Sequence, residues 1–114
     1  MVSTMPAEQR FDRLVALLPS LEAGTCAQDV LEKVVYEDRI MPQSFDWPAW
    51  KDEGHRYLEP GGVETADLEI CRRLLTVLVR QERFVEGSLD AALKDGLVGR
   101  VVRRVAEVVA NAGH

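Results

Sequence analysis

TADLEICRRLLTVLVRQERF, residues 65–84, is the stretch that decides the fold. At 100° per residue its apolar side chains cover an arc of about 200°. These side chains are Leu68, Ile70, Cys71, Leu74, Leu75, Val77, Leu78 and Val79. An apolar stripe of this width needs neighbours on more than one side, so residues 65–82 are predicted to form the central helix, with Thr65 as its N-cap. Phe84 lies off the stripe, which predicts that the helix ends or bends near Arg83.

Two shorter helical patterns follow the central helix. Gly87 is expected to break the chain and Ser88 to cap a short helix, LDAALKD, that Gly96 ends. Residues 97–111 then predict a last helix that packs against the central one. Its apolar stripe consists of Val98, Val101, Val102, Val105, Val108 and Val109.

Turn and cap signals also divide the chain upstream of residue 65. Asp46 and Pro48 predict the start of a helix, and the string EPGG at 59–62 predicts the turn after it. Thr25 and Gln28 have the spacing of a capping box, which predicts a helix over about 26–36. The β-branched residues at 33–36 leave a strand as an open alternative there.

The N-terminal segment has its own apolar helical pattern, from Phe11 to Leu21. Pro6 and Glu8 suit its first turn. Pro19 is expected to end or kink this helix near Leu18, and Gly24 to stop it. Together these patterns predict a mainly α fold, a compact bundle of about five helices with an irregular extended connector near 37–45. A chain of 114 residues is expected to form one domain, residues 1–114.

Composition narrows the classes of function. The net charge is −5, and residues 1–64 carry a balance of −6 against +1 for residues 65–114. An acidic chain argues against non-specific nucleic-acid binding, although a local arginine patch stays possible. No apolar run is long enough to span a membrane, and the N-terminus lacks the pattern of a signal peptide. We therefore expect a cytoplasmic protein.

Catalytic and metal-binding motifs are not evident. Cys26 and Cys71 lie in apolar segments and are expected to be reduced, buried thiols. His55 and His114 are the only histidines, and His55 is more typical of a solvated helix edge than of a general base. We predict no catalytic residue, no metal site and no cofactor, which leaves an enzyme built on His55 and the tryptophans as the least favoured hypothesis.

Two groups of side chains are candidates for a binding surface. The first is aromatic, namely Phe45, Trp47, Trp50 and Tyr57. These rings form either part of the core or a partly exposed hot spot. The second is charged and consists of Arg72, Arg73, Arg80, Arg83, Glu86, Arg100, Arg103 and Arg104. These arginines either pair with Glu69, Glu82, Glu86 and Glu107 on the same helices or form a surface that recognises carboxylate or phosphate.

The order helix, Gly-Ser break, short helix is similar to a helix-turn-helix. The second helix of this pair carries Asp90, Lys94 and Asp95, a net negative charge. It has no Arg, Asn or Gln to contact a base edge, so DNA recognition by this motif is not expected.

Three strings, SFDWPAW, CRRLLTVLVRQERFVEG and GLVGRVVRRVAEV, together resemble a bacterial domain family of unknown function, over about residues 44–107. The family pattern is an F-D-W segment followed by L-L-T-x-x-V-R-x-x-R-F-x-E-G. The resemblance implies no activity. It favours a structural corner in which Phe84 enters the core, Gly87 adopts a backbone angle that other residues avoid, and Glu86 pairs with Arg83 or Arg80.

These observations predict a non-enzymatic protein-interaction module that binds another protein or itself, with a homodimer possible and no membrane contact. The alternative is a nucleic-acid-associated accessory protein that uses an arginine-rich helical face. Nucleic acid is the less expected partner because the second helix of the helix-turn-helix pattern is acidic.

Overall fold

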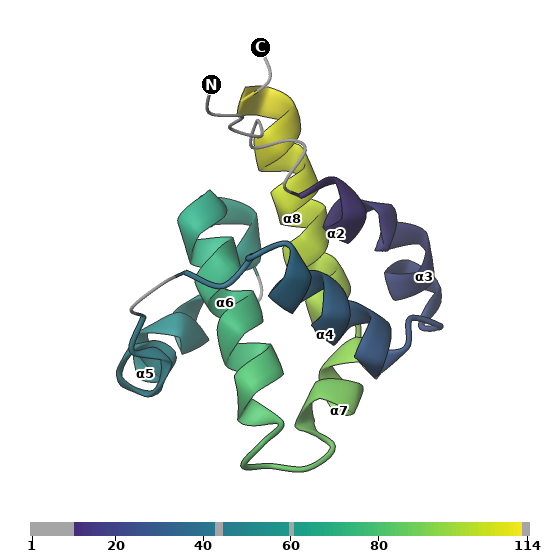
Figure 1. Cartoon of the computed structure of the whole chain (residues 1–114). Coiled ribbons are helices and arrows are strands. Elements are labelled where there is room, and N and C mark those ends of the chain that lie inside the picture. Colours follow the sequence, from purple (N-terminus) through teal and green to yellow (C-terminus); the bar gives the residue numbers. More distant parts are fainter. Residues whose placement is uncertain (1–10, 43–44, 60, 113–114) are drawn as a thin grey trace, which may run out of the picture.

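The computed structural model describes residues 11–42, 45–59 and 61–112. Within them the chain forms seven α-helices and one turn of 3-10 helix, and no strand (Figure 1). The elements are α2 (Asp12–Ala16), α3 (Leu18–Ala23), α4 (Gln28–Glu37), α5 (Trp47–Leu58), η1 (Val63–Thr65), α6 (Leu68–Gln81), α7 (Ser88–Lys94) and α8 (Leu97–Ala112). The predicted mainly α class is confirmed, and the predicted helix count was too low.

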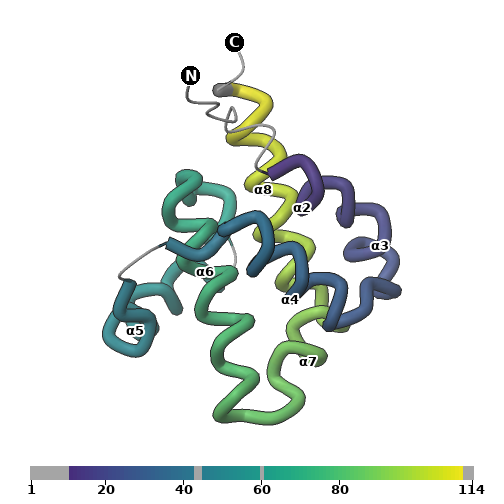
Figure 2. Tube along the Cα trace, viewed as in Figure 1, coloured from purple at the N-terminus to yellow at the C-terminus, as the bar shows by residue number. Residues whose placement is uncertain are grey.

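The central helix is α6, as its stripe predicts. It packs against α8, α5 and α7, and it runs beside α8 through the middle of the molecule (Figure 2). Its buried side chains include Cys71, Leu74, Leu75, Val77 and Val79. Because these point to several sides of the helix, α6 requires several neighbours to cover them.

The start of α6 differs from the prediction. Asp67, not Thr65, is the N-cap, and its carboxylate accepts a hydrogen bond from the Ile70 N–H at 2.9 Å. Thr65 lies in η1, where its hydroxyl donates to the Gly62 carbonyl at 2.8 Å. Thr and Asp are both common N-cap residues. Because Thr65 is already part of η1, α6 begins later and Asp67 is its N-cap.

Helix α8 confirms the predicted last helix to within a residue. Its inner face buries Val98, Val101, Val102 and Val105 completely. Helix α8 packs against α3 at Gly99, where a Cβ would lie 3.6 Å from the Cβ of Leu21, an ordinary contact distance. The contact brings Arg103, one turn further along α8, close to Glu22 of α3.

The N-terminal segment forms two helices, α2 and α3, where one was predicted, which explains part of the higher number of helices. The predicted break near Leu18 occurs at Leu17, and Pro19 lies in the first turn of α3, where its missing N–H leaves no hydrogen bond unmade. Gly24 ends α3 with a φ of 74°. The predicted start at Pro6 and Glu8 lies outside the described residues.

The predicted capping box before α4 does not form. Ala27 is the N-cap, the Thr25 hydroxyl donates to the Ser20 carbonyl at 3.4 Å, and the Gln28 side chain donates to Glu32 at 3.2 Å. Residues 33–36 are helical, which removes the strand alternative. The predicted connector follows, and its described part is irregular as expected.

The prediction that Phe84 enters the core at the turn between α6 and α7 is wrong. Phe84 is 76% exposed, and Leu89 of α7 is the residue buried completely in that region. Helix α6 ends at Gln81, so the following turn carries Phe84 away from the core face. Gly87 has a φ of 88°, which confirms its predicted conformation.

Ser88 does not cap α7 either. Gly87 occupies the N-cap position without a side-chain bond, and Ser88 is the first residue of the helix. The capping acceptor comes instead from Glu82, whose carboxylate accepts from the N–H groups of Gly87 and Leu89, both at 2.9 Å. A residue of the preceding helix end therefore caps the next helix.

Candidate functional site

The predicted arginines do not form one surface. Arg100, Arg103 and Arg104 line a cleft beside α8, Arg72 and Arg73 face the connector, and Arg80 and Arg83 lie near the turn between α6 and α7. Their neighbours give these three groups different roles.

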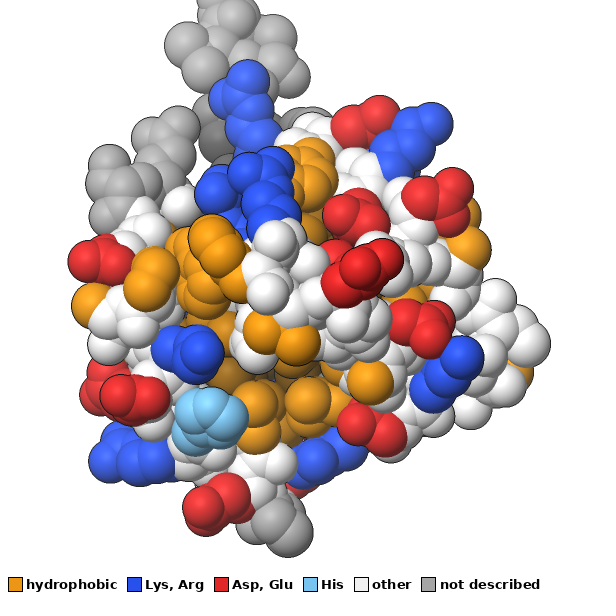
Figure 3. Space-filling model, turned by 90° about the horizontal axis from the view of Figure 1, so that it is seen from below, with side chains coloured by type: hydrophobic (Ala, Val, Ile, Leu, Met, Phe, Trp, Pro, Cys, Tyr) orange, Lys and Arg blue, Asp and Glu red, His pale blue; other side chains and the backbone are white. Residues whose placement is uncertain are grey.

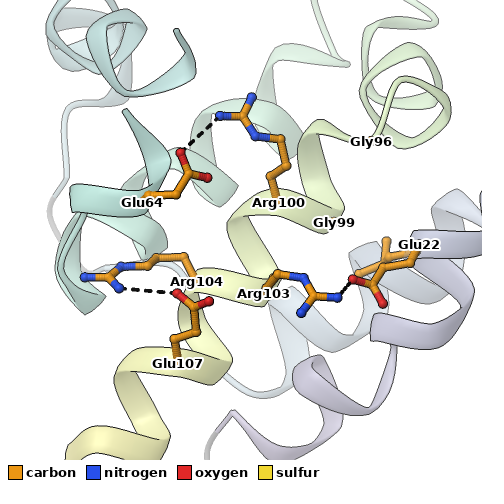
Figure 4. A pocket seen from close by; sticks show the side chains of 9 residues that line it. Glu22, Glu64, Gly96, Gly99, Arg100, Arg103, Arg104 and Glu107 are labelled. Atoms are coloured by element: carbon orange, nitrogen blue, oxygen red, sulfur yellow. Dashed lines mark hydrogen bonds and ion pairs between the residues drawn. The ribbon is translucent and has the colours of Figure 1, made fainter. Parts of the chain in front are cut away.

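The α8 cleft lies between α3, η1 and α8 and has a volume of about 240 Å³ (Figure 4). Each arginine that lines it points to a glutamate. Arg103 pairs with Glu22 of α3, Arg100 with Glu64 of η1 at 3.6 Å, and Arg104 with Glu107 at 3.3 Å. Three cations face three carboxylates, so the side chains that line the cleft carry no net charge.

This arrangement gives the α8 cleft a structural role. Arg103 and Arg100 join α8 to elements far away in the sequence, and the Arg104 Nε–H donates to the Ala66 carbonyl at 2.8 Å. The pairs are partly exposed, so each contributes at most about 1 kcal/mol. An incoming anion would have to displace carboxylates that remain within reach and repel it.

Arg72 and Arg73 hold the connector against α6. The Arg72 Nε–H donates to the Ile40 carbonyl at 2.8 Å, and its guanidinium pairs with Glu69 at 3.1 Å. The guanidinium of Arg73 lies 5.1 Å from the ring centre of Phe45 and 5.8 Å from that of Trp50. These contacts position the aromatic residues that the sequence analysis selected.

The aromatic group divides into a core part and a surface part. Trp50 is buried, and its ring stacks on Tyr57 with centres 6.4 Å apart. Gly54 is needed beneath it, because a Cβ there would clash with the indole. Phe45 packs edge-on against Trp50 at 5.7 Å. For Trp50 and Tyr57 the core interpretation fits the geometry, while Trp47 faces the turn that follows α6.

A second cleft, the connector cleft, lies between the connector, the start of α5 and α6. Its volume is about 390 Å³, and it is lined by Met41, Pro42, Phe45, Asp46, Trp47, Thr76 and Arg80. Trp47 and Arg80 were predicted from the sequence as candidates, whereas Met41, Pro42 and Thr76 were not. No sequence signal identifies these three, since the connector has no period that would predict its contact with α6.

Exposed apolar side chains continue from this cleft onto the turn. The ring of Trp47 lies 5.9 Å from the ring of Phe84, centre to centre. Phe84 and its neighbour Val85 are the two most exposed large apolar side chains in the described part of the chain. On the end of the molecule that this turn occupies, apolar side chains gather between charged ones of both signs (Figure 3).

Arg80 and Arg83 differ from the other five candidate arginines. Within the described residues neither makes an ion pair or a side-chain hydrogen bond. The predicted pairing with Glu82 is wrong, because two backbone N–H groups occupy its carboxylate and lower its pKa. Glu86 is exposed and reaches neither arginine. Pairing on the same helix is confirmed for Glu69 and Glu107.

Two thiols and one imidazole among the described residues, Cys26, Cys71 and His55, lie in different environments. Burial raises the pKa of the Cys71 thiol to about 12, the nearby Arg104 lowering it only in part, so this thiol stays protonated at neutral pH. Cys26 is a half-buried free thiol. His55 is exposed on α5 and borders only a small gap of about 30 Å³.

The residues that the structure describes contain no group of three or more His, Cys, Asp or Glu side chains that could hold a metal ion. None of their helices combines the length and hydropathy that crossing a membrane would require.

Comparison with known proteins identifies a family. No curated protein and no solved structure shows significant similarity to this chain. The model of a family of unknown function, DUF6508, matches residues 7–111. This match is wider than the resemblance over about 44–107, because it also takes in α2, α3 and α4. The chain therefore belongs to DUF6508, a family of unknown function.

Proposed function

We propose that this protein is a protein-interaction module that binds its partner through one surface, the corner surface. We define the corner surface as the connector cleft together with Arg83, Phe84 and Val85. The observation that carries the proposal is the side chain of Phe84, which is 76% exposed beside Trp47 and the cleft. The expected setting is the bacterial cytoplasm, in line with the resemblance that the sequence strings carry.

Aromatic and arginine side chains at the corner surface support the proposal. Interface hot spots are enriched in Trp, Tyr and Arg, and they lie in concave regions from which water can be excluded. The corner surface combines Trp47, Phe84 and Arg80 around one cleft. A single exposed apolar residue needs no explanation, whereas a contiguous apolar patch is typical of a binding site.

The same geometry supports the nucleic-acid alternative less well than it supports the interaction module. Five of the seven candidate arginines are paired with glutamates, and the two groups on α8 and α6 face different neighbours. Phosphate binding needs several free cations along one face. Of the seven candidate arginines, only Arg80 and Arg83 make no ion pair within the described residues.

The test is a pull-down from bacterial lysate with tagged protein, with and without nuclease. We compare Phe84→Ser with Tyr36→Ser, a matched control because Tyr36 is an exposed aromatic residue of α4 with no role in the corner surface. Both variants should melt like the wild type. We expect a protein partner that survives nuclease, is retained by Tyr36→Ser and is lost in Phe84→Ser.

Two results would overturn the proposal. Capture that is equally strong with Phe84→Ser would remove the corner surface as the site. Partners that disappear with nuclease would favour the nucleic-acid alternative. If sedimentation instead shows a dimer that only Phe84→Ser dissociates, the partner is a second copy of the chain, and the corner surface is still its binding site.

A further inference from the structure

The connector cleft has features that define the chemistry of what it can bind. Four apolar residues line it, Met41, Pro42, Phe45 and Trp47, together with the polar side chains of Asp46, Thr76 and Arg80. Arg80 is the one cation among the described residues that line it. At about 390 Å³ it lies at the lower end of the range for ligand pockets, which is enough for one or two side chains of a partner.

Arg80 is half-buried in this cleft and lacks a counter-ion within the described residues. Two carboxylates lie near Arg80, that of Glu82 along the chain and that of Asp46 in the cleft. Both already accept hydrogen bonds from backbone N–H groups. Asp46 caps α5 by accepting from the Ala49 N–H at 3.2 Å, and Glu82 caps α7. A half-buried guanidinium is screened less by water than a fully exposed one, which favours pairing with an added carboxylate.

We infer that the connector cleft binds a short segment of the partner in which an Asp or Glu carboxylate pairs with Arg80 and an adjacent apolar side chain packs on Trp47 and Phe45. This inference rests on the proposed function and adds the chemical class of the ligand. A carboxylate suits the site better than a phosphate dianion does, because one arginine supplies the charge and the Asp46 carboxylate on the rim opposes a second negative charge.

The probes for the test are three capped tetrapeptides. The first is acidic and apolar (Leu-Asp-Leu-Glu), the second is its neutral counterpart (Leu-Asn-Leu-Gln), and the third is acidic without apolar side chains (Ser-Asp-Ser-Glu). The chain has two tryptophans, so its indole N–H signals in a proton–nitrogen NMR spectrum report separately on Trp47 in the cleft and on buried Trp50.

We expect the first peptide to shift the Trp47 signal and to leave the Trp50 signal nearly unchanged. The other two peptides should bind about tenfold more weakly, since each lacks one of the two contacts. Arg80→Gln should remove the preference for the acidic peptide over the neutral one. Arg103→Gln is the matched control, because that arginine lies in the α8 cleft, and it should preserve the preference.

Three outcomes would overturn the inference: equal binding of the acidic and neutral peptides, an unchanged preference in Arg80→Gln, or no shift with any peptide at millimolar concentration. Tighter binding of inorganic phosphate than of the first peptide would also contradict it. These failures are distinct from failure of the proposed function, which is measured by partner capture with Phe84→Ser. Capture that depends on Phe84 but not on Arg80 would keep the corner surface and reject the carboxylate.

Discussion

The α8 cleft and the connector cleft contain similar residues with different partners. Around the α8 cleft, α3 supplies Glu22 and η1 supplies Glu64 to the arginines of α8 (Figure 4). Around the connector cleft, Arg80 receives no carboxylate from the described residues, because Asp46 and Glu82 cap helices. The arginines of the α8 cleft pair with glutamates of the same chain, whereas Arg80 lacks a counter-ion within the described residues and, in the proposed function, pairs with a partner.

The comparison shows that an arginine acquires its role from what neighbouring elements bring to it. The pattern Arg-x-x-Arg occurs at Arg80 and Arg83 and again at Arg100 and Arg103. Only the second pair lies opposite glutamates of other elements. Sequence spacing alone therefore does not distinguish a structural arginine from a free one.

The largest expected effect concerns which residue anchors the corner between α6 and α7. Leu89→Ala should lower the free energy of unfolding by about 2–5 kcal/mol, because it empties a completely buried site. Phe84→Ala should change it by less than about 0.5 kcal/mol, because that ring is mostly in solvent. Urea unfolding of both variants is the measurement, and similar losses would show that Phe84 is buried in solution.

The second effect concerns the close approach of α8 and α3 beside the α8 cleft. Gly99→Leu should destabilise the protein by about 1–3 kcal/mol, because the extra atoms would push against Leu21. Gly99→Ala should stabilise it by up to about 1 kcal/mol, since a methyl group fits at ordinary contact distance and Ala favours helix. Thermal unfolding of the two variants tests this, and a loss of stability in Gly99→Ala would contradict the packing described.

The third effect is a dependence of stability on pH that comes from Glu82. Its folded pKa is lowered by two backbone N–H donors, so its contribution is complete above the unfolded pKa of about 4.3 and is lost as the pH falls through the folded pKa. Glu82→Gln should therefore be less stable than the wild type at neutral pH, and the difference should shrink in acid.

Denaturant midpoints measured at neutral pH and in the acid range test this dependence. Glu86→Gln is the control. Because Glu86 is exposed, the stability of this variant should match that of the wild type at each pH. A difference for Glu82→Gln that stays constant as the pH falls would show that its carboxylate does not cap α7.

The smallest effect compares the paired with the unpaired arginines directly. A double-mutant cycle of Arg103→Ala and Glu22→Ala should give a coupling of about 0.2–1 kcal/mol, as expected for a partly exposed ion pair. The same cycle for Arg80→Ala and Glu82→Ala should give none within error. Coupling between Arg80 and Glu82 would mean that the connector cleft has an internal counter-ion, which would weaken the proposed carboxylate site.

Most helices could be located from the sequence because their signals are local. The stripes of α6 and α8 repeat every three to four residues, and Asp46 caps α5 as predicted. The predicted cap is wrong where two suitable residues lie close together, as with Thr65 and Asp67. The cap of α7 was not predicted, because Glu82 acts across seven residues and no helix-start pattern has that spacing.

For the candidate site, the residue types were predictable and their grouping was not. Trp47 and Arg80 were selected, yet only the contact of the connector with α6 brings them into one cleft with Met41 and Thr76. Trp50 and Tyr57 were selected with them, and packing places Trp50 in the core. Side chains far apart in the sequence meet through tertiary packing, which periodicity does not encode.

The sequence by itself determined the mainly α class, the order and approximate bounds of the central and last helices, and the turns at Gly24, Gly87 and Gly96, because each depends on propensity or backbone freedom within a few residues. The tertiary structure decided that Leu89 and not Phe84 enters the core, and which arginines meet a glutamate. Those outcomes depend on the direction the chain takes after each helix end. They also depend on which element, distant in the sequence, packs opposite a given side chain.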